Sequence, residues 1–221
     1  MEKQIDILAQ GRGWIGVDKP AGLSVHNDPG QDLISLLRAH LGEKIYPVHR
    51  LDRATSGVLL LAHDPKTLAR LCAAFKENQV KKHYLALVHG QFETDQGRWD
   101  MPLAPGAGGR SQPAGRGKKQ RAVTHYKVRA QSPHYALLDI ELETGRTHQI
   151  RRHAKLSGHP VTGDARYGSQ RAIRFLNEQK NFYRMGLHSS RLELNNRGDR
   201  IRLSSPSAPK EMLALMEEDR S

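Results

Sequence analysis

The spacing of hydrophobic residues predicts several helices along the chain. Leucines at positions 33, 36, 37 and 41 recur at helical intervals, and Asp32 and Gly42 are residue types that favour the two ends of a helix. Asp64-Pro65 is a typical helix start, and the apolar residues within 68–75 then fall on one face. Further helices are expected over 146–156, 172–182 and 209–218.

Other stretches have the apolar runs or the alternation that β-strands require. Residues 58–62 are all apolar, which is typical of a buried strand, whereas residues 83–89 alternate. Similar patterns cover 14–17, 123–130, 135–143, 185–194 and 200–203. The sequence has no internal repeat and no regular alternation of strands and helices. It therefore predicts an α+β fold, with a mainly antiparallel mixed sheet and flanking helices, in a single domain over 1–221.

The segment from Pro102 to Arg121 interrupts this pattern. It contains three prolines and five glycines, and no acidic residue lies between Asp100 and Asp139. A segment of this composition has too few apolar side chains to order itself, so the sequence predicts a flexible basic insertion at about 104–121. An ordinary surface loop is one interpretation, and an arm that contacts RNA phosphates is the other. The candidate contacts are Lys118, Lys119 and Arg121.

Charge and cysteine content narrow the partners and the compartment. The net formal charge is +12 and the pI is near 10.0, and such chains usually bind nucleic acid or an anionic membrane surface. No apolar run approaches the roughly 20 residues that a membrane-spanning helix needs, and the N-terminus does not resemble a signal peptide. The single cysteine, Cys72, excludes an intrachain disulfide and is expected in the core. These features predict a cytoplasmic protein.

The polar turn immediately before the 58–62 strand is the strongest candidate for chemistry. It reads His49-Arg50-Leu51-Asp52-Arg53-Ala54-Thr55-Ser56-Gly57. So many ionisable groups beside a core strand are costly unless they pair with one another or with a ligand. Asp52, with an arginine on each side, suits a nucleophilic or acid–base carboxylate acting on an anionic substrate. Taken alone, a carboxylate that only caps backbone amides is the simpler interpretation.

Several other chemistries lack the residues that they require. The histidines at 148, 153 and 159 do not have the helical spacing of a zinc-binding pair, so no metal site is predicted. The sequence has no GxxxxGK[ST] phosphate loop, no GxGxxG turn after a strand and no Gly-x-Ser-x-Gly elbow. We therefore expect no metal, no nucleotide and no other cofactor.

Several motifs together make the chain resemble the RluA branch of the pseudouridine synthases, from about Val17 to Ser204. The turn at 49–57 resembles the nucleophile motif of that branch, and Lys82-His83-Tyr84-Leu85-Ala86-Leu87-Val88-His89-Gly90 resembles its tyrosine motif. The third motif is matched by 144–153 with Gly158-His159-Pro160 and Gly163-Asp164. Asp18-Lys19-Pro20-Ala21-Gly22 and Leu187-His188 resemble the first and last short motifs. The resemblance implies a cofactor-independent enzyme that isomerises uridine in structured RNA.

The resemblance also implies roles for individual residues. Asp52 corresponds to the catalytic aspartate, which attacks the nucleoside so that the base detaches and rejoins the ribose through C5; attack on the sugar and attack on the base both stay open. Tyr84 corresponds to the tyrosine that packs against the target base, with a core-filling tyrosine as the alternative. Arg151 corresponds to the arginine that pairs with the aspartate and keeps it ionised. Asp164 is expected to be structural.

The remaining candidates are RNA contacts. Arg50 corresponds to an arginine beside the nucleophile that can fill the gap left when a uridine leaves its stack. Phosphate or loop contacts are expected from His49, Arg53, Thr55, Arg146 and His148, and a structural role is an equal alternative for each.

The position of the first motif predicts how the substrate is selected. Many family members have a separate RNA-binding domain before the catalytic domain, and 17–22 comes too early in this chain to leave room for one. We therefore expect a monomer whose catalytic domain selects a stem–loop, in ribosomal RNA first and transfer RNA next. One alternative is a catalytically silent RNA-binding or ribosome-assembly factor on the same fold. The other is a glycosidase-type hydrolase, for which we find no water-activating group.

Overall fold

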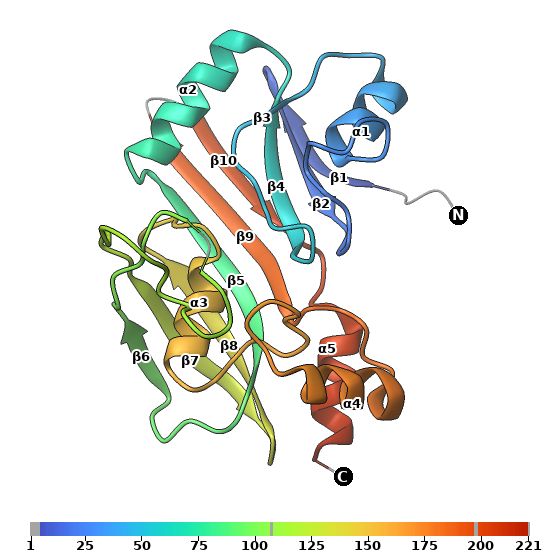
Figure 1. Ribbon diagram of the computed structural model, residues 1–221. Coiled ribbons are helices and arrows are strands. Elements are labelled where there is room, and N and C mark those ends of the chain that lie inside the picture. The colour runs from blue at the N-terminus through green and yellow to red at the C-terminus, as the bar shows by residue number, and fades with distance from the viewer. Residues whose placement is uncertain (1–4, 107, 197–198, 221) are drawn as a thin grey trace. The chain divides into compact units, whose positions relative to one another are not determined.

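The chain folds into two compact units. The computed structural model describes residues 5–106, 108–196 and 199–220. Unit 1 comprises Met1–Lys82 and Ser189–Ser207, and unit 2 comprises His83–His188 and Ala208–Ser221. Figure 1 shows the helices and strands of both units. The single-domain organisation stays a prediction.

Unit 1 is built on antiparallel strands. The strands β1 (Asp6–Gly11), β2 (Trp14–Lys19), β4 (Ser56–Ala62) and β9 (Leu187–Asn196, in this unit from Ser189) are hydrogen-bonded in that order. The short β3 (Tyr46–Pro47) pairs with β4, and β10 (Asp199–Ser204) pairs with β9. The β1–β2, β2–β4, β3–β4 and β9–β10 pairs are all antiparallel. The predicted buried strand thus becomes an inner strand, β4.

Two helices of unit 1 begin at the capping residues that the sequence indicates. The Asp32 carboxylate accepts the Ser35 N–H at 2.8 Å and starts α1 (Leu33–Leu41), which ends at Gly42 in the left-handed region. The Asp64 carboxylate accepts the Thr67 N–H at 2.9 Å at the start of α2 (Pro65–Lys76). Both helix predictions are confirmed.

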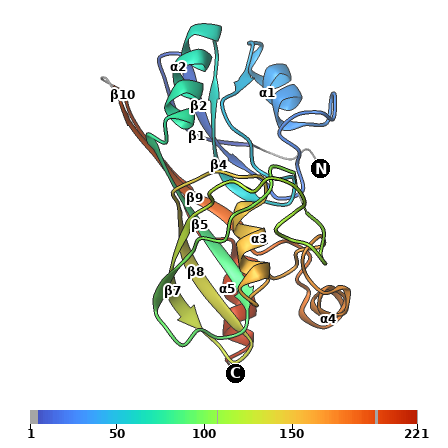
Figure 2. The same cartoon turned by 60° about the vertical axis from the view of Figure 1, so that its left-hand side comes forward.

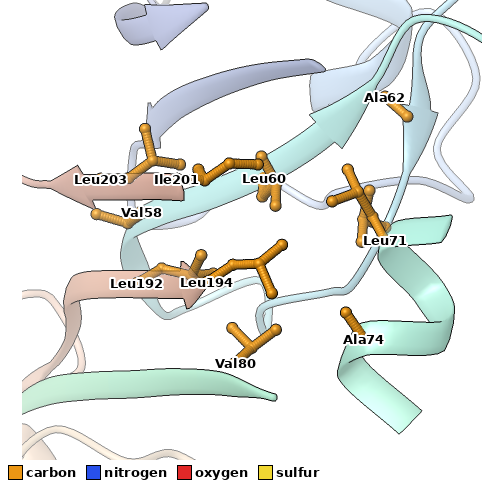
Figure 3. Close-up of a cluster of buried hydrophobic side chains, with 11 residues drawn as sticks. Val58, Leu60, Ala62, Leu71, Ala74, Val80, Leu192, Leu194, Ile201 and Leu203 are labelled. Atoms are coloured by element: carbon orange, nitrogen blue, oxygen red, sulfur yellow. The ribbon is translucent and has the colours of Figure 1, made fainter. Parts of the chain in front are cut away.

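A hydrophobic cluster of unit 1 packs against one face of β4. All seven residues of β4 are buried. Figure 3 shows three of them, Val58, Leu60 and Ala62, in one cluster with leucines and an isoleucine of β9 and β10 and with two residues of α2. The partners are Leu192, Leu194, Ile201, Leu203, Leu71 and Ala74. Fully burying a leucine or valine side chain stabilises a fold by roughly 1.5–3 kcal/mol. The strand that follows the Asp52 turn is therefore firmly anchored.

Unit 2 contains a second set of antiparallel strands with three helices. The strands β5 (Val80–His89, in this unit from His83), β8 (Tyr135–Leu142), β7 (Thr124–Gln131) and β6 (Gln96–Trp99) pair in that order, all antiparallel. The helices are α3 (Gln149–Leu156), α4 (Gln170–Lys180) and α5 (Lys210–Glu218). Helix α3 contacts β7 and α5 contacts β8 (Figure 2).

The apolar side chains of unit 2 form their own core. Leucines of β5 and β8 pack against residues from α4, from α5 and from the segment between α4 and β9. The cluster consists of Leu85, Leu87, Tyr135, Leu137, Leu176, Phe182, Met212, Leu215 and Met216. The α+β fold with a mainly antiparallel sheet and flanking helices is confirmed. Strands β1 and β6 were not predicted, because most of their residues are exposed or half-buried and they lack an apolar pattern.

Candidate active site

Lys19 holds the turn that carries Asp52. Its side chain is completely buried, and its Nζ donates hydrogen bonds to the carbonyl oxygens of Leu23 at 2.8 Å, Pro20 at 3.0 Å and Arg53 at 3.2 Å. A buried ammonium group needs such partners because its desolvation is costly. Since Arg53 directly follows Asp52, this lysine fixes the backbone beside the carboxylate. Only its place in the 18–22 motif signals this role in the sequence.

Backbone hydrogen bonds close the turn further. The Thr55 N–H donates to the Asp52 carbonyl oxygen at 3.0 Å. Gly22 and Arg53 are joined twice, because the Gly22 N–H donates to the Arg53 carbonyl at 2.8 Å and the Arg53 Nε donates back to the Gly22 carbonyl at 3.1 Å. The two segments 18–22 and 49–57 therefore form one local framework within unit 1.

Gly57 lets the chain leave this turn and enter β4. Its φ is +107°, a region that other residue types rarely adopt. A Cβ at this position would lie 2.1 Å from the Ser189 carbonyl oxygen. Glycine is therefore required here.

The side chains of the turn differ in their access to a ligand. Asp52 is half-buried, and Arg50 and Arg53 on either side of it are exposed. Thr55 is only 2% exposed, which favours the structural alternative for its side chain, and its RNA contact stays a prediction. The turn thus presents one carboxylate with two accessible cations.

His49 belongs to the interior of unit 1. Its Nε2 accepts the Leu60 N–H at 3.0 Å, and its ring stacks on Phe75 with ring centroids 4.6 Å apart. Burial, together with the nearby Lys82 charge, lowers the pKa of His49 to about 3. A neutral imidazole in these contacts supports β4, which favours the structural alternative for His49, and its RNA contact stays a prediction.

Tyr84 lies in β5 of unit 2. It is opposite Ile140 of β8 in the antiparallel register and is 9% exposed. The strand fixes the position of its backbone, and its role against the target base stays a prediction.

Arg151 and Asp164 form a buried ion pair in unit 2. The Asp164 carboxylate accepts hydrogen bonds from Nε of Arg151 at 2.8 Å and from Nη2 at 2.9 Å, and it is completely buried. It also accepts the N–H groups of Arg166 and Tyr167. Burial alone would raise the pKa of Asp164, but the bonds from Arg151 and these amides hold it below its usual value. Asp164 is therefore an ionised anchor for Arg151.

Other predicted RNA contacts of unit 2 are tied to their neighbours. Arg146 Nε donates to the Arg121 carbonyl at 3.0 Å, and the Arg121 side chain pairs with Glu143. His148 adopts a φ of +52° at the start of α3, and its Nδ1 lies 3.0 Å from the Tyr167 hydroxyl. The structure thus brings Arg121 and Arg146 together.

The candidate catalytic residues are distributed over both units. Asp52, with Arg50 and Arg53, lies in unit 1, and Tyr84 and Arg151 lie in unit 2. Lys118 and Lys119 are exposed on unit 2. Among the described residues, no group of three or more histidine, cysteine or acidic side chains is arranged to hold a metal ion. Within the same residues, no helix has the length and apolar character needed to cross a membrane.

Comparison with known proteins gives consistent matches. A family model described as RNA pseudouridylate synthase matches residues 13–156. A tRNA pseudouridine synthase C of Pasteurella multocida is 37% identical, over 85% of this chain and 84% of the relative. An uncharacterised RNA pseudouridine synthase of Zymomonas mobilis is 43% identical, over 80% of this chain and 82% of the relative. The solved structure of human RNA pseudouridylate synthase domain containing 4 is 26% identical with a TM-score of 0.76, covering 97% of this chain and 93% of that one.

Proposed function

Because this chain belongs to the RNA pseudouridine synthase family, we propose that it isomerises a uridine in structured RNA with Asp52 as its nucleophile. The observation that carries this proposal is the fixed Asp52 turn. Lys19 and Gly22 hold the backbone at Arg53, while the Asp52 side chain is half-buried between two exposed arginines. A carboxylate held in this way is preorganised for attack on an anionic substrate.

The reaction needs no group other than those of enzyme and RNA. When the carboxylate attacks the sugar, a bond from Asp52 to ribose C1′ forms as the bond from C1′ to N1 of the base breaks. The base then turns, its C5 bonds to C1′, the carboxylate is released, C5 loses its proton and N1 gains one. The first step follows the logic of a retaining glycosidase, and re-use of the base replaces an activated water. Attack on the base also ends in loss of the C5 proton.

Tyr84 and Arg151 complete the proposed catalytic set. Tyr84 would pack against the target base and accept its C5 proton. Arg151 would keep Asp52 ionised, since an adjacent guanidinium stabilises a carboxylate. The two hydrogen bonds that Arg151 donates to Asp164 support this role because they fix the orientation of the guanidinium.

Recognition of the RNA would use the exposed cations. Arg50 would occupy the gap left by the extruded uridine, which recovers part of the few kcal/mol that extrusion costs. The proposed phosphate contacts are Arg53, Arg146, Lys118 and Lys119, with Arg121 and His148 as further contacts. His49 and Thr55 complete the predicted RNA-binding residues, each with its structural role as the alternative. We propose that the protein does this as a monomer in the cytoplasm, without a metal or cofactor.

Transfer RNA and ribosomal RNA are the two substrate classes to compare. The sequence favoured ribosomal RNA, and the Pasteurella multocida relative is named as an enzyme of transfer RNA. Because that relative is matched over 84% of its own length, we propose a transfer-RNA stem–loop as the first substrate to test.

The test is release of tritium from RNA labelled at uridine C5. Wild-type protein and Asp52→Asn are compared on transfer RNA and ribosomal RNA, with chelator present. We expect release by the wild type alone, with unchanged RNA affinity in the variant. Release at a wild-type rate by Asp52→Asn would remove Asp52 from the mechanism. Binding without release on either RNA would favour the silent RNA-binding factor, and free uracil would favour the hydrolase.

A further inference from the structure

Arg152 is a completely buried arginine whose guanidinium is surrounded by backbone carbonyls. Its Nη1 donates to the Ala104 carbonyl at 3.0 Å, its Nη2 to the Ala114 carbonyl at 2.6 Å and its Nε to the Pro113 carbonyl. A further bond from Nη1 reaches Thr147 at 3.2 Å. In the part of the chain that the structure describes, no carboxylate bonds to this guanidinium. Three of its four bonds therefore hold both ends of one loop.

That loop, residues 104–117 without the undescribed position 107, has a defined backbone. The Ala104 N–H donates to the Ala114 carbonyl at 2.9 Å, and the flanking Leu103 and Gln120 form an antiparallel bridge. The Gly115 N–H donates to the Gln112 carbonyl at 3.0 Å. Both views show the segment between β6 and β7 running past α3, the helix that carries Arg152 (Figures 1 and 2). The sequence predicts a flexible segment here, and this geometry gives it an anchor.

The anchored loop encloses an open hollow with a volume of about 370 Å³. It is lined by four glycines together with Ser111, Gln112 and Arg116. Arg116 is exposed and is oriented by a 2.8 Å bond from its Nε to Gln112. A Cβ added at Gly106 or Gly109 would meet no atom within 4 Å. The hollow therefore combines open space at two glycines with an exposed cation, and a cation at such a site suits a phosphate group.

The surroundings of the hollow are basic. Arg110 is exposed, and its Nη2 is held at 3.3 Å from the Ala165 carbonyl. Arg166 donates from Nε to the Gly108 carbonyl at 2.9 Å. The chain has no acidic residue from Met101 to Leu138. An RNA backbone is the anionic polymer that such a site fits.

We propose that Arg152 is a positioning residue that preorganises loop 104–117, and that the hollow of this loop holds a backbone phosphate of the substrate RNA outside the target nucleotide. This inference rests on the proposed function. A loop that is ordered before the RNA arrives loses less conformational freedom on binding, so the anchor favours affinity. The chemical step does not use Arg152.

The first test separates binding from chemistry. Arg152→Met removes the donors but keeps much of the side-chain volume, and Arg152→Lys restores the charge with fewer, differently placed donors. We expect the KM for RNA to rise about tenfold in Arg152→Met, because preorganisation is lost, and kcat to stay within about twofold. In Arg152→Lys the KM should lie between the values for the wild type and Arg152→Met. Hydrogen exchange should show lost protection at the amides of Ala104 and Gly115.

The second test fills the hollow without touching Arg152. Since a Cβ at Gly109 meets nothing, Gly109→Ala and Gly109→Leu should fold alike, and the alanine variant is the matched control for the leucine variant. We expect the KM for RNA to rise at least about fivefold in Gly109→Leu and little in Gly109→Ala. If Arg152→Met fails to fold, the two Gly109 variants still test whether the hollow binds the RNA.

Unchanged KM values in Gly109→Leu and in a folded Arg152→Met would overturn the inference. Loop amides that stay protected in Arg152→Met would overturn the anchoring role. The proposed function fails separately, since it predicts tritium release by the wild-type protein whatever these variants do.

Discussion

Asp164 holds Arg151 by two parallel hydrogen bonds, with Nε–Oδ2 and Nη2–Oδ1 distances of 2.8 and 2.9 Å. The carboxylate is completely buried and the guanidinium nearly so. Two-point contact fixes the plane of an arginine as well as its position. Asp164 therefore acts as a positioning residue for the arginine that we assign to the catalytic set.

Replacing Asp164 by asparagine should destabilise unit 2 strongly. The substitution leaves the Arg151 charge buried without its anion, which typically costs about 3–5 kcal/mol. Asp139 provides a matched control because it also accepts two hydrogen bonds from one arginine, Arg129. In this pair, however, both side chains are about half exposed. We expect Asp139→Asn to lower the free energy of unfolding by only about 0–1 kcal/mol. Urea denaturation of both variants measures the difference, and equal losses would contradict the assigned role.

Lys19→Met should impair both stability and turnover. It removes the donor of the Pro20 and Leu23 carbonyls and leaves the Arg53 carbonyl with only the Gly22 N–H. A buried acceptor that loses its partner costs about 1–3 kcal/mol. The loss of the bond to Arg53 should also displace Asp52, so kcat at saturating RNA should fall at least about tenfold, as misplacement of a nucleophile does. Lys81→Met, at an exposed position of β5, is the control. A folded Lys19→Met protein with wild-type kcat would show that the turn keeps its geometry without the lysine.

The imidazole of His49, hydrogen-bonded to Leu60 and stacked on Phe75, predicts an acid-sensitive fold. The pKa of His49 is about 3, whereas an unfolded histidine titrates near its usual 6.5. Between these values the unfolded chain binds the proton and the folded chain does not. The stability that the neutral ring contributes is therefore complete above about pH 6.5 and is lost toward pH 3, at up to about 1.4 kcal/mol per pH unit.

His49→Gln tests this pH dependence. Glutamine can still accept the Leu60 N–H but does not titrate, so the free energy of unfolding should fall less steeply from pH 6.5 to pH 4 than in the wild type. Burial also lowers the pKa of His188, to about 4, so some acid sensitivity should persist. Identical slopes in wild type and variant would refute the neutral, buried state of His49.

Local signals in the sequence predicted much of this structure. The caps at Asp32 and Asp64 and the apolar run of β4 depend on neighbouring residues, and these elements form as expected. The contacts of Arg152 with the loop could not be predicted, because its partners there lie 38 to 48 residues away. Because these distant contacts leave no local signal, the composition of residues 104–121 predicts a flexible segment. The sequence places His49 in a charged turn, which is typical of a binding residue. Only the structure shows that its ring packs against Phe75 and supports the core.

The exposed pair Lys118 and Lys119 should contribute to RNA binding through charge. Each cation that neutralises a phosphate releases counterions, so the logarithm of the binding constant falls with the logarithm of salt by about 0.7–0.9 per contact. Neutralising both lysines to glutamine should weaken binding and reduce this slope by about 1.4–1.8. Arg121 is kept in this variant because it pairs with Glu143.

The control must remove the same charge elsewhere. Lys66 and Lys76 are exposed on α2 of unit 1, and their double replacement by glutamine changes the net charge equally. If the lysines at 118 and 119 contact phosphates directly, only their loss should reduce the salt slope, because contacts and not net charge set the number of released counterions. Equal reductions in both variants would mean that the long-range field of the basic chain carries the effect. An unchanged slope in both would make the 118–119 lysines ordinary solvated side chains.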